Sequence, residues 1–260
     1  MIPRNFIEAW RKEVPWTSVD MVEQDLVLSK AITDIYNNEF LQKRLAFRGG
    51  TAIYKLYVNP PARYSEDLDF TQVNPEELRL TCDEIRDVLS WIDEQPAFKQ
   101  KGDNFTFHFK YLSEEGATKK VKVEINCREH IAVYGTVAKE FKFENPFHSA
   151  SALVTTFELE ELLASKLRAL YQRRKGRDLF DLWYVNEKTD IDTDKILAAF
   201  PAYIQDTSKR ITSKIFLQNL RQKRTNKLFL EDIGPLLNPS IEYVQEKAFD
   251  WIASALIEKL

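Results

Sequence analysis

The stretch from Phe47 to Phe70 constrains the fold and the chemistry of this chain most strongly. It reads FRGGTAIYKLYVNPPARYSEDLDF and contains a glycine pair, a proline pair and two aspartates. The apolar run that ends at Phe47 predicts a strand that enters a turn at Gly49 and Gly50. A helix over 51–57 would aim its free N–H groups at the same place. Glycine lets a phosphate approach the backbone, so the pattern indicates a phosphate site, with a plain turn as the alternative.

The two aspartates that follow lie on one face of a predicted strand. After the proline pair, the segment 63–70 alternates with the strand period. Asp67 and Asp69 therefore share a face, with Cα atoms about 6–7 Å apart, while Leu68 and Phe70 face the core. Two carboxylates placed in this way can converge on one or two Mg²⁺ ions. The alternative is a solvated acidic strand end, which would not require the glycine turn upstream.

A third carboxylate is predicted on a neighbouring strand. Two strands, 105–112 and 120–126, are joined by a turn over 113–116. In the second strand the apolar residues alternate, so Glu124 lies on the face that points away from the core. A third carboxylate completes the metal ligands of a phosphoryl-transfer site and can accept a proton from the attacking hydroxyl. A simply solvated glutamate is the alternative.

From residue 155 onward the pattern is helical. Leucines repeat at helical spacing over 159–170, and Lys166 lies on or beside that buried stripe, where a lysine must reach solvent or meet anions. In one unbroken helix Lys166 and Asp178 would be about 18 Å apart. We therefore expect the first helix to end at Gly176 and Asp178 to cap a second one. An ordinary helix start, in which that aspartate forms an exposed ion pair with its neighbour, is the alternative.

Composition indicates a globular protein. The chain has 260 residues, of which 44% are hydrophobic and 30% charged, which is ordinary for soluble domains. Cys82 and Cys127 have neither disulfide-framework nor zinc-site spacing. No run of about 18 apolar residues predicts a membrane span, and the N-terminus lacks the apolar region of a signal peptide, so we expect a cytoplasmic protein. The change in pattern predicts a core over 1–150 and a helical domain over 151–260.

One basic segment departs from the acidic balance of the chain. The net charge is -3, which argues against a protein that coats nucleic acid by charge alone. The segment 209–227 nevertheless contains seven basic residues and no acidic one. It is a candidate surface for the backbone of a nucleic acid, with a solvated basic face as the alternative. Its basic residues are Lys209, Arg210, Lys214, Arg221, Lys223, Arg224 and Lys227.

Taken together, the two motifs resemble those of the AbiEii family, nucleotidyltransferase toxins of type IV toxin-antitoxin and abortive-infection systems. The likeness spans roughly residues 20 to 190. The first motif is Gly49-Gly50-Thr51 with Arg63-x-Ser65-x-Asp67-Leu68-Asp69. The second is Leu162-x-x-x-Lys166-x-x-Ala169-x-x-x-Arg173-x-x-x-Arg177-Asp178-x-x-Asp181.

The resemblance implies an α+β fold, with a polymerase-β-like nucleotidyltransferase core of mixed sheet and flanking helices and a helical C-terminal region that contributes the second motif. It also implies Mg²⁺ bound by Asp67 and Asp69, with Glu124 as the third carboxylate, and a requirement for Lys166 and Asp178 in catalysis. Because the family more usually has Asp at the third position, a base and a pure metal ligand both stay open for Glu124. The residues assigned to the NTP are Gly49, Gly50, Thr51, Ser65, Lys166 and Arg177.

The leading hypothesis is a Mg²⁺-dependent toxin that transfers a nucleoside monophosphate from an NTP to RNA, with the 3' end of tRNA as the expected acceptor. The family also implies an antitoxin encoded nearby. A second hypothesis keeps the chemistry and changes the acceptor to a small molecule or a protein hydroxyl. A third is a non-catalytic, nucleotide-binding regulator that acts through a partner.

Overall fold

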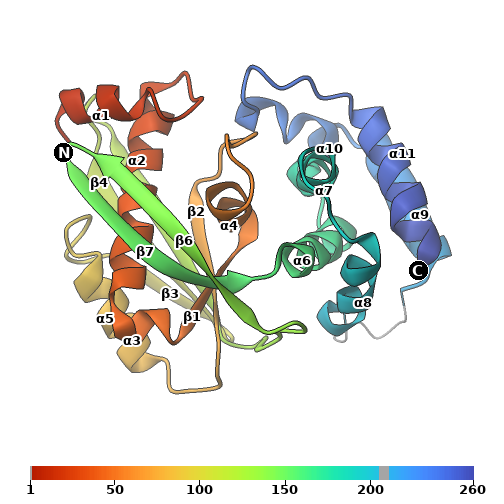
Figure 1. The fold of residues 1–260 in the computed structure, drawn as a ribbon, viewed down its shortest axis with the longest axis horizontal. Helices are drawn as coiled ribbons and strands as arrows, with labels where there is room; N and C mark the ends of the chain where they lie inside the picture. Colours follow the sequence, from red (N-terminus) through yellow and green to blue (C-terminus); the bar gives the residue numbers. More distant parts are fainter. Residues whose placement is uncertain (1, 205–210) are drawn as a thin grey trace. The chain divides into compact units, whose positions relative to one another are not determined.

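The computed structural model describes residues 2–204 and 211–260, and the chain divides into two compact units. The first, which we call the sheet unit, contains Met1–His130 and Thr136–Phe157. The second, which we call the helical unit, contains Ile131–Gly135 and Glu158–Leu260. The sheet and helices of the first unit and the helices of the second together give the chain the α+β character that the resemblance implies (Figure 1).

A seven-stranded mixed sheet forms the centre of the sheet unit (Figure 1). The strand order is β3-β4-β5-β2-β1-β7-β6. β2 runs parallel to β5 and β1 runs parallel to β7, while the other neighbouring pairs are antiparallel. The strands are β1 Leu45–Arg48, β2 Asp67–Gln72, β3 Ala97–Lys101, β4 Asn104–Leu112, β5 Thr118–Asn126, β6 Thr136–Asn145 and β7 His148–Phe157.

Alternation along the strands separates the core face of the sheet from its polar face. In β5, Val121, Val123 and Ile125 are fully buried, whereas Lys122 and Glu124 between them are partly exposed. Successive strand side chains point to opposite faces, so a strand with this pattern has one face in the core and one available for chemistry. The predicted placement of Glu124 on the non-core face of its strand agrees with this pattern.

Five helices accompany the sheet in the described part of this unit. They are α1 Arg4–Trp10, α2 Val19–Asn37, α3 Glu39–Gln42, α4 Gly49–Leu56 and α5 Arg79–Val88. The long helix α2 packs on β7 and β6. Its residue Tyr36 is buried with its ring 6.2 Å from that of Phe70, which in turn lies 5.3 Å from the ring of Phe47. These aromatic contacts join α2 to β1 and to β2, the strand that contains both aspartates.

A buried carboxylate connects the helices of the sheet unit. Asp25 on α2 is 2% exposed and accepts hydrogen bonds from the indoles of Trp10 at 2.9 Å and Trp16 at 3.1 Å. The ammonium of Lys55 on α4 lies 2.7 Å from the same carboxylate. A buried charge is tolerated only when it is paired and hydrogen-bonded, and these three donors meet that condition.

The strands β6 and β7 are absent from the sequence-based prediction, and the predicted helix start at residue 155 is wrong. Thr155 and Thr156 lie at the end of β7, and α6 begins at Leu159. The Thr156 hydroxyl donates to the carbonyl of Phe47 at 2.7 Å and the Thr155 hydroxyl to that of Gln42 at 3.0 Å. The two threonines therefore tie β7 to its surroundings and do not cap a helix.

The helical unit is built from short helices around α6 and α7. Its α-helices are α6 Leu159–Gln172, α7 Gly176–Lys188, α8 Thr193–Tyr203, α9 Ser213–Arg224, α10 Lys227–Glu231 and α11 Gln245–Ala255, with 3-10 turns η1 Gly234–Leu236 and η2 Ile257–Lys259. No helix in the described ranges is long and apolar enough to cross a membrane.

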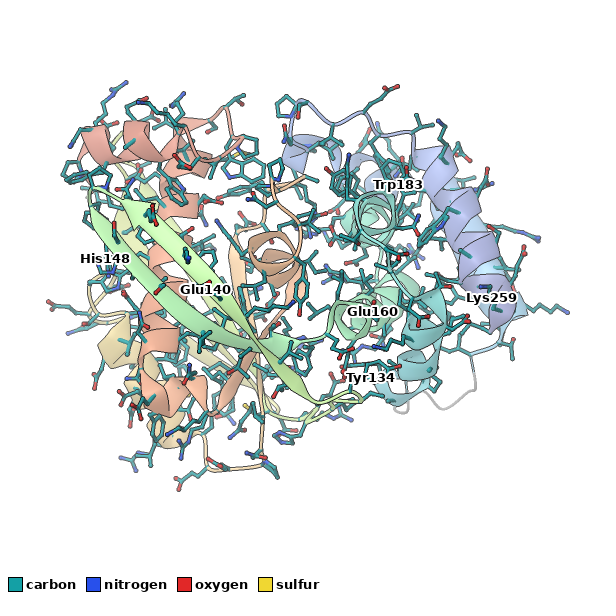
Figure 2. The ribbon with its side chains drawn as sticks, viewed as in Figure 1. Tyr134, Glu140, His148, Glu160, Trp183 and Lys259 are labelled. Carbon is teal, nitrogen blue, oxygen red and sulfur yellow. The ribbon has the colours of Figure 1, made fainter. Side chains whose placement is uncertain are left out.

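Glu161 attaches the segment Ile131–Gly135 to this unit. Its fully buried carboxylate accepts hydrogen bonds from the backbone of Val133 at 2.6 Å and of Tyr134 at 3.0 Å. The hydroxyl of Tyr203 donates to it at 2.7 Å. Figure 2 shows Tyr134 close to α6 and α8, where its hydroxyl donates to the carbonyl of Lys195 at 2.8 Å.

We predict that Asp25→Ala lowers the free energy of unfolding by about 3 kcal/mol, because it leaves a buried ammonium and two indole N–H groups without their acceptor. Urea unfolding followed by tryptophan fluorescence measures the change. Asp87→Ala, at an exposed position of α5, is the matched control and changes it little. Equal stability of the two variants contradicts the role assigned to Asp25.

Candidate active site

Parallel pairing of β2 and β5 brings the three predicted carboxylates together. In the register of these strands Asp69 lies opposite Glu124, and Asp67 lies opposite Lys122. Neighbouring strands are about 4.8 Å apart, and residues opposite each other project from the same face. The three carboxylates are therefore neighbours on the polar face of the sheet.

Lys122 lies among these carboxylates and is missed by the sequence-based prediction. Its ammonium is 2.7 Å from Glu124 Oε2 and 3.3 Å from Asp67 Oδ2. Burial opposes its charge, but the hydrogen bond to Glu124 and the negative charge of Asp67 outweigh burial and raise the pKa of Lys122. The alternation of β5 already places Lys122 on the face of Glu124, so the signal was present in the sequence.

The surroundings of Asp69 disfavour its ionised form. Burial, together with the negative charges of Asp67 and Glu124, raises the pKa of Asp69 to about 6. Added positive charge would lower this pKa and stabilise the ionised carboxylate. A divalent cation or the cationic part of a ligand would supply that charge.

The donor chemistry of this cluster fits a hard divalent cation. Asp67, Asp69 and Glu124 supply carboxylate oxygens, the ligands that Mg²⁺ prefers, and burial beside the two other carboxylates raises the pKa of Asp69. Within residues 2–204 and 211–260, no three His, Cys, Asp or Glu side chains are arranged as a ready-made metal site. Lys122 pairs with two of the three carboxylates, so binding of a cation requires its ammonium to withdraw.

The glycine pair opens α4 directly beside the aspartates. Gly49 has a φ of +80°, and a Cβ atom there would lie 2.5 Å from Asp69 Oδ2. A Cβ atom on Gly50 would lie 2.2 Å from Arg63 Nη2. The helix thus begins at Gly49, two residues earlier than predicted. The close approach of Asp69 and Arg63, added to the positive φ, explains why glycine occupies both positions.

Thr51 and Ser65 link α4 to the strand that carries the aspartates. The Thr51 hydroxyl, which is 2% exposed, donates to the carbonyl of Asp67 at 2.6 Å and lies 2.8 Å from Ser65 Oγ. In this arrangement Thr51 positions Asp67 through its backbone, and Ser65 is the more accessible of the two hydroxyls. Their assignment to nucleotide binding stays a prediction.

The second motif forms a buried ion cluster within the helical unit. The Lys166 ammonium lies 3.2 Å from Asp178 Oδ1 and 2.8 Å from Asp181 Oδ2, and both aspartates are fully buried. Arg173 meets Asp178 with both Nε, at 2.7 Å, and Nη2, at 2.8 Å. Burial opposes ionisation, but Lys166 and Arg173 outweigh it and lower the pKa of Asp178.

The chain does turn between Lys166 and Asp178, although not as predicted. α6 ends at Gln172 and α7 begins at Gly176, so the turn lies over 173–175. Gly176 is therefore the first residue of a helix, and Asp178 is an internal helical residue that does not cap it. A Cβ atom on Gly176 would lie 2.2 Å from the carbonyl oxygen of Phe229, so close packing against α10 explains this glycine.

Arg177, assigned to the nucleotide, is engaged by Asp232. Its backbone N–H donates to Asp232 Oδ2 at 3.3 Å, and its Nε lies 3.6 Å from the same oxygen. Lys175 pairs with the other oxygen of Asp232 at 3.1 Å. The role of Arg177 in nucleotide binding stays a prediction.

The basic segment is less exposed than predicted. Lys209 and Arg210 lie outside the described residues. The placement of Lys223 on an exposed face is wrong, because it is 3% exposed and its ammonium donates to the carbonyl of Tyr171 at 3.0 Å near the end of α6. Burial lowers the pKa of Lys223 to about 8.

Two further cations of the segment are paired with carboxylates. Arg224 forms ion pairs with Glu246 and Asp250, and Lys227 lies 3.7 Å from Glu231. Lys214 and Arg221 are exposed and have no such partner in the described parts of the chain. The segment therefore presents fewer free positive charges than its sequence indicates.

We predict that the pKa of Asp69 contributes to the pH dependence of stability in protein treated with a chelator. Because the folded pKa is raised from 3.8 to about 6, this group favours the folded state at low pH and loses that contribution as the pH rises through 6. Asp69→Asn should remove about 2 kcal/mol of this dependence, as measured by urea unfolding between pH 4 and pH 7. Asp87→Asn serves as the control, and identical pH profiles for the Asp69→Asn variant and the wild type contradict the prediction.

Comparison with known proteins identifies the family and the fold of this chain. The chain matches the family model described as nucleotidyl transferase AbiEii toxin, Type IV TA system, over residues 31–255. It is similar to the structure of MenT4, nucleotidyltransferase toxin Rv2826c from Mycobacterium tuberculosis H37Rv, with a TM-score of 0.63 and 19% identity, covering 100% of this chain and 91% of that chain. No match was found among curated protein sequences.

A weaker structural likeness is to an antigenic nucleotidyltransferase-like protein from Paracoccidioides brasiliensis. It has a TM-score of 0.43 and 17% identity, and covers 69% of this chain and 87% of that chain. The family match extends over both units, and the likeness to MenT4 confirms the expected fold. The chain belongs to the AbiEii family of nucleotidyltransferase toxins of type IV toxin-antitoxin systems.

Proposed function

We propose that this toxin transfers a nucleoside monophosphate from an NTP to an RNA acceptor, with the 3' end of tRNA as the expected target and Mg²⁺ as the cofactor. Membership of the family gives the nucleotidyltransferase activity, the NTP donor and the association with a cognate antitoxin. The observation that supports a metal-dependent transfer is the cross-strand pair of Asp69 and Glu124, next to Gly49 at the start of α4.

The donor occupies the side of the site formed by β1, β2 and α4. The free N–H groups at the start of α4 point toward anions, and the glycines let phosphates approach the backbone closely. Asp67 and Asp69 would hold Mg²⁺, which would supply neutralising charge for the phosphates and Lewis-acid polarisation at the reacting phosphorus. The acceptor oxygen forms a bond to the α-phosphorus, the bond to the bridging oxygen breaks, and pyrophosphate leaves.

Glu124 takes part from the neighbouring strand. As a base, it accepts the proton from the acceptor hydroxyl, and the Lys122 ammonium lies 2.7 Å from its carboxylate in the protein without ligand. As a ligand alone, it would only complete the set of carboxylates. Glu124→Gln separates the two roles, because loss of a base abolishes transfer while cation binding by the two aspartates is retained.

The ion cluster of the helical unit contains the family's second motif, to which we assign a role in binding the nucleotide. We assign Lys166 to the phosphates of the nucleotide and Asp178 to the positioning of Lys166, in line with the family motif. Asp178 lies 3.2 Å from the Lys166 ammonium, and Arg173 fixes the orientation of that carboxylate through two hydrogen bonds. Asp181 provides the second acceptor for Lys166 at 2.8 Å.

The burial of Lys223 weakens the case for RNA as the acceptor, so a second class of acceptor is also considered. With Lys223 buried and Arg224 and Lys227 paired, the basic segment is a weaker RNA surface than its sequence indicates. A small molecule or a protein hydroxyl is therefore the alternative acceptor. A non-catalytic regulator is disfavoured, because an idle site would have no need for three carboxylates on one sheet face, where burial and the charges of Asp67 and Glu124 raise the pKa of Asp69.

We predict that Asp67→Asn and Asp69→Asn each reduce nucleotide transfer by about a thousandfold, because loss of metal-held charge removes several kcal/mol of transition-state stabilisation. Labelled NTPs, Mg²⁺ and total tRNA provide the assay, and Asp87→Asn is the control that keeps full activity. Transfer that persists in both active-site variants would show that another site performs the reaction.

We further predict that Lys122→Gln tightens the binding of a divalent cation about tenfold, because an ammonium no longer competes for Asp67 and Glu124. Isothermal titration of the NTP-free protein with Mn²⁺ measures this affinity. Lys12→Gln, at an exposed position outside the sheet, controls for the change in net charge. Unchanged or weaker Mn²⁺ binding by the Lys122→Gln variant would place the cation elsewhere.

A further inference from the structure

A basic groove lies on the polar face of the sheet next to Asp67. It has a volume of about 660 Å³, and Asp67 itself is among the residues that line it. The basic residues of the groove come from β4 and from β5 at the start of the strand. We call four of them the cationic ladder: His108, Lys110, Lys120 and Lys122. The three lysines carry its positive charge, because burial and the charges of Lys120 and Lys122 lower the pKa of His108.

Strand register arranges the ladder in two rungs. His108 lies opposite Lys122, and Lys110 lies opposite Lys120, in the antiparallel pair of β4 and β5. The rungs are two residues apart, which is about 7 Å along a strand. Because Lys122 also lies opposite Asp67, the ladder leads away from the carboxylates along the same face.

The folded protein alone does not explain this arrangement. Like charges directly opposite each other destabilise a sheet, and the ammonium groups of Lys110 and Lys120 have no carboxylate partner within the described ranges, although the backbone N–H of Lys110 donates to Asp93 at 2.9 Å. His108 Nδ1 is buried without a hydrogen-bond partner among these residues. By contrast, the neighbouring Lys119 pairs with Asp20 of α2. An anion bound between the rungs would offset the repulsion.

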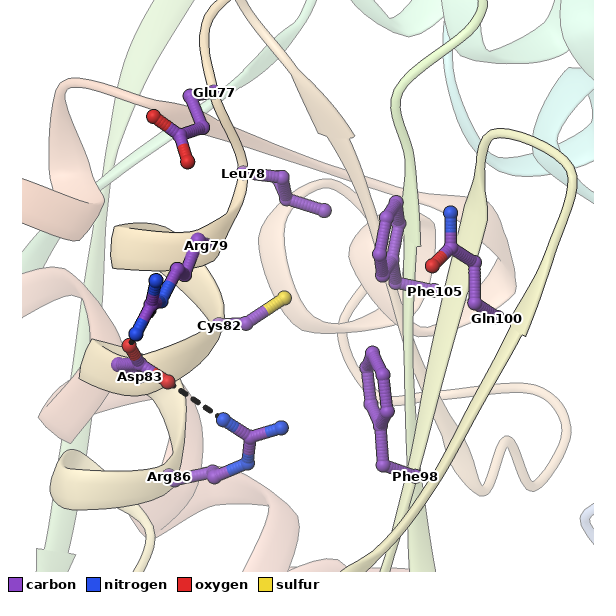
Figure 3. A pocket seen from close by; sticks show the side chains of 9 residues that line it. All are labelled: Glu77, Leu78, Arg79, Cys82, Asp83, Arg86, Phe98, Gln100 and Phe105. Carbon is purple, nitrogen blue, oxygen red and sulfur yellow. Dashed lines mark hydrogen bonds and ion pairs between the residues drawn. The ribbon is translucent and has the colours of Figure 1, made fainter.

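A second groove in the sheet unit shows what ordinary pairing looks like. It lies between α5 and the strands β3 and β4, where Phe98 faces the helix (Figure 3). Its cations are paired with Asp83, since Arg86 Nη1 lies 2.7 Å and Arg79 Nε 4.0 Å from that carboxylate. No comparable excess of positive charge is left in that groove. The ladder differs from it in having lysine side chains without carboxylate partners among the described residues.

The position of the ladder separates it from the donor. The glycines follow β1, on one side of β2, whereas the ladder occupies β5 and β4 on the other side. With strands about 4.8 Å apart, β4 is about 14 Å from β1, farther than the three linked phosphates of an NTP held at the start of α4 extend. Glu124, the proposed base, lies on the same strand as Lys120 and Lys122.

We propose that the cationic ladder binds the phosphate backbone of the RNA acceptor and leads its 3' hydroxyl to Glu124. The inference rests on the proposed RNA acceptor and assigns its binding surface to the sheet unit. Lysines opposite phosphates supply affinity without reading sequence. The ladder therefore favours the end of an RNA strand, which it would bind through the sugar-phosphate backbone whatever the base sequence.

The double variant Lys110→Gln/Lys120→Gln tests the ladder without changing a carboxylate. We expect its affinity for a short single-stranded RNA and for total tRNA to fall about 25-fold at 0.1 M salt, with the slope of log K against log salt reduced by about 1.4. The KM for the acceptor should rise accordingly while the KM for the NTP stays the same. Its urea midpoint should not fall, because a repulsion has been removed.

The control is Lys12→Gln/Lys247→Gln, which removes two exposed lysines with no ion pair in the described parts of the chain and should leave both KM values unchanged. An equal loss of RNA affinity in both double variants would overturn the ladder in favour of general charge. A raised KM for the NTP with unchanged RNA affinity would overturn it in favour of donor binding and leave the proposed function intact. Wild-type transfer to a non-RNA acceptor, without RNA binding, would overturn both proposals.

Discussion

The parallel pairing of β2 with β5 is the constraint on which the site depends. It sets Asp69 opposite Glu124 and Asp67 opposite Lys122, so carboxylates that are distant in sequence become neighbours on one face. The core residues on the other face, such as Val123 and Phe70, fix this register because they are almost completely buried. A slip by one residue would move every functional side chain into the core.

The site also shows electrostatic tension that a bound ligand would relieve. Burial, together with the charges of Asp67 and Glu124, raises the pKa of Asp69 to about 6, and the opposed lysines Lys110 and Lys120 repel each other on the same sheet face. The carboxylates attract a cation, whereas the lysines attract phosphates. Such local conflicts are expected where function outweighs stability.

Local patterns predicted much of this arrangement, and long-range contacts account for the errors. Alternation placed Asp67, Asp69 and Glu124 on the polar face, because strand periodicity is local. Lys122 follows the same alternation and was overlooked. The burial of Lys223 depends on contacts with the end of α6 more than fifty residues away, which no local pattern reveals. Likewise, a glycine is required at position 176 because the carbonyl of Phe229 packs against it, and not because α6 ends there.

Sequencing the 3' ends of cellular RNA after induction of the protein tests the central claim most directly, because it identifies the acceptor and the added nucleotide together. The account predicts extra nucleotides at tRNA 3' ends with the wild type and unmodified ends with Asp69→Asn. Growth inhibition by the wild type with all RNA 3' ends unchanged would contradict it and move the search to small-molecule or protein acceptors.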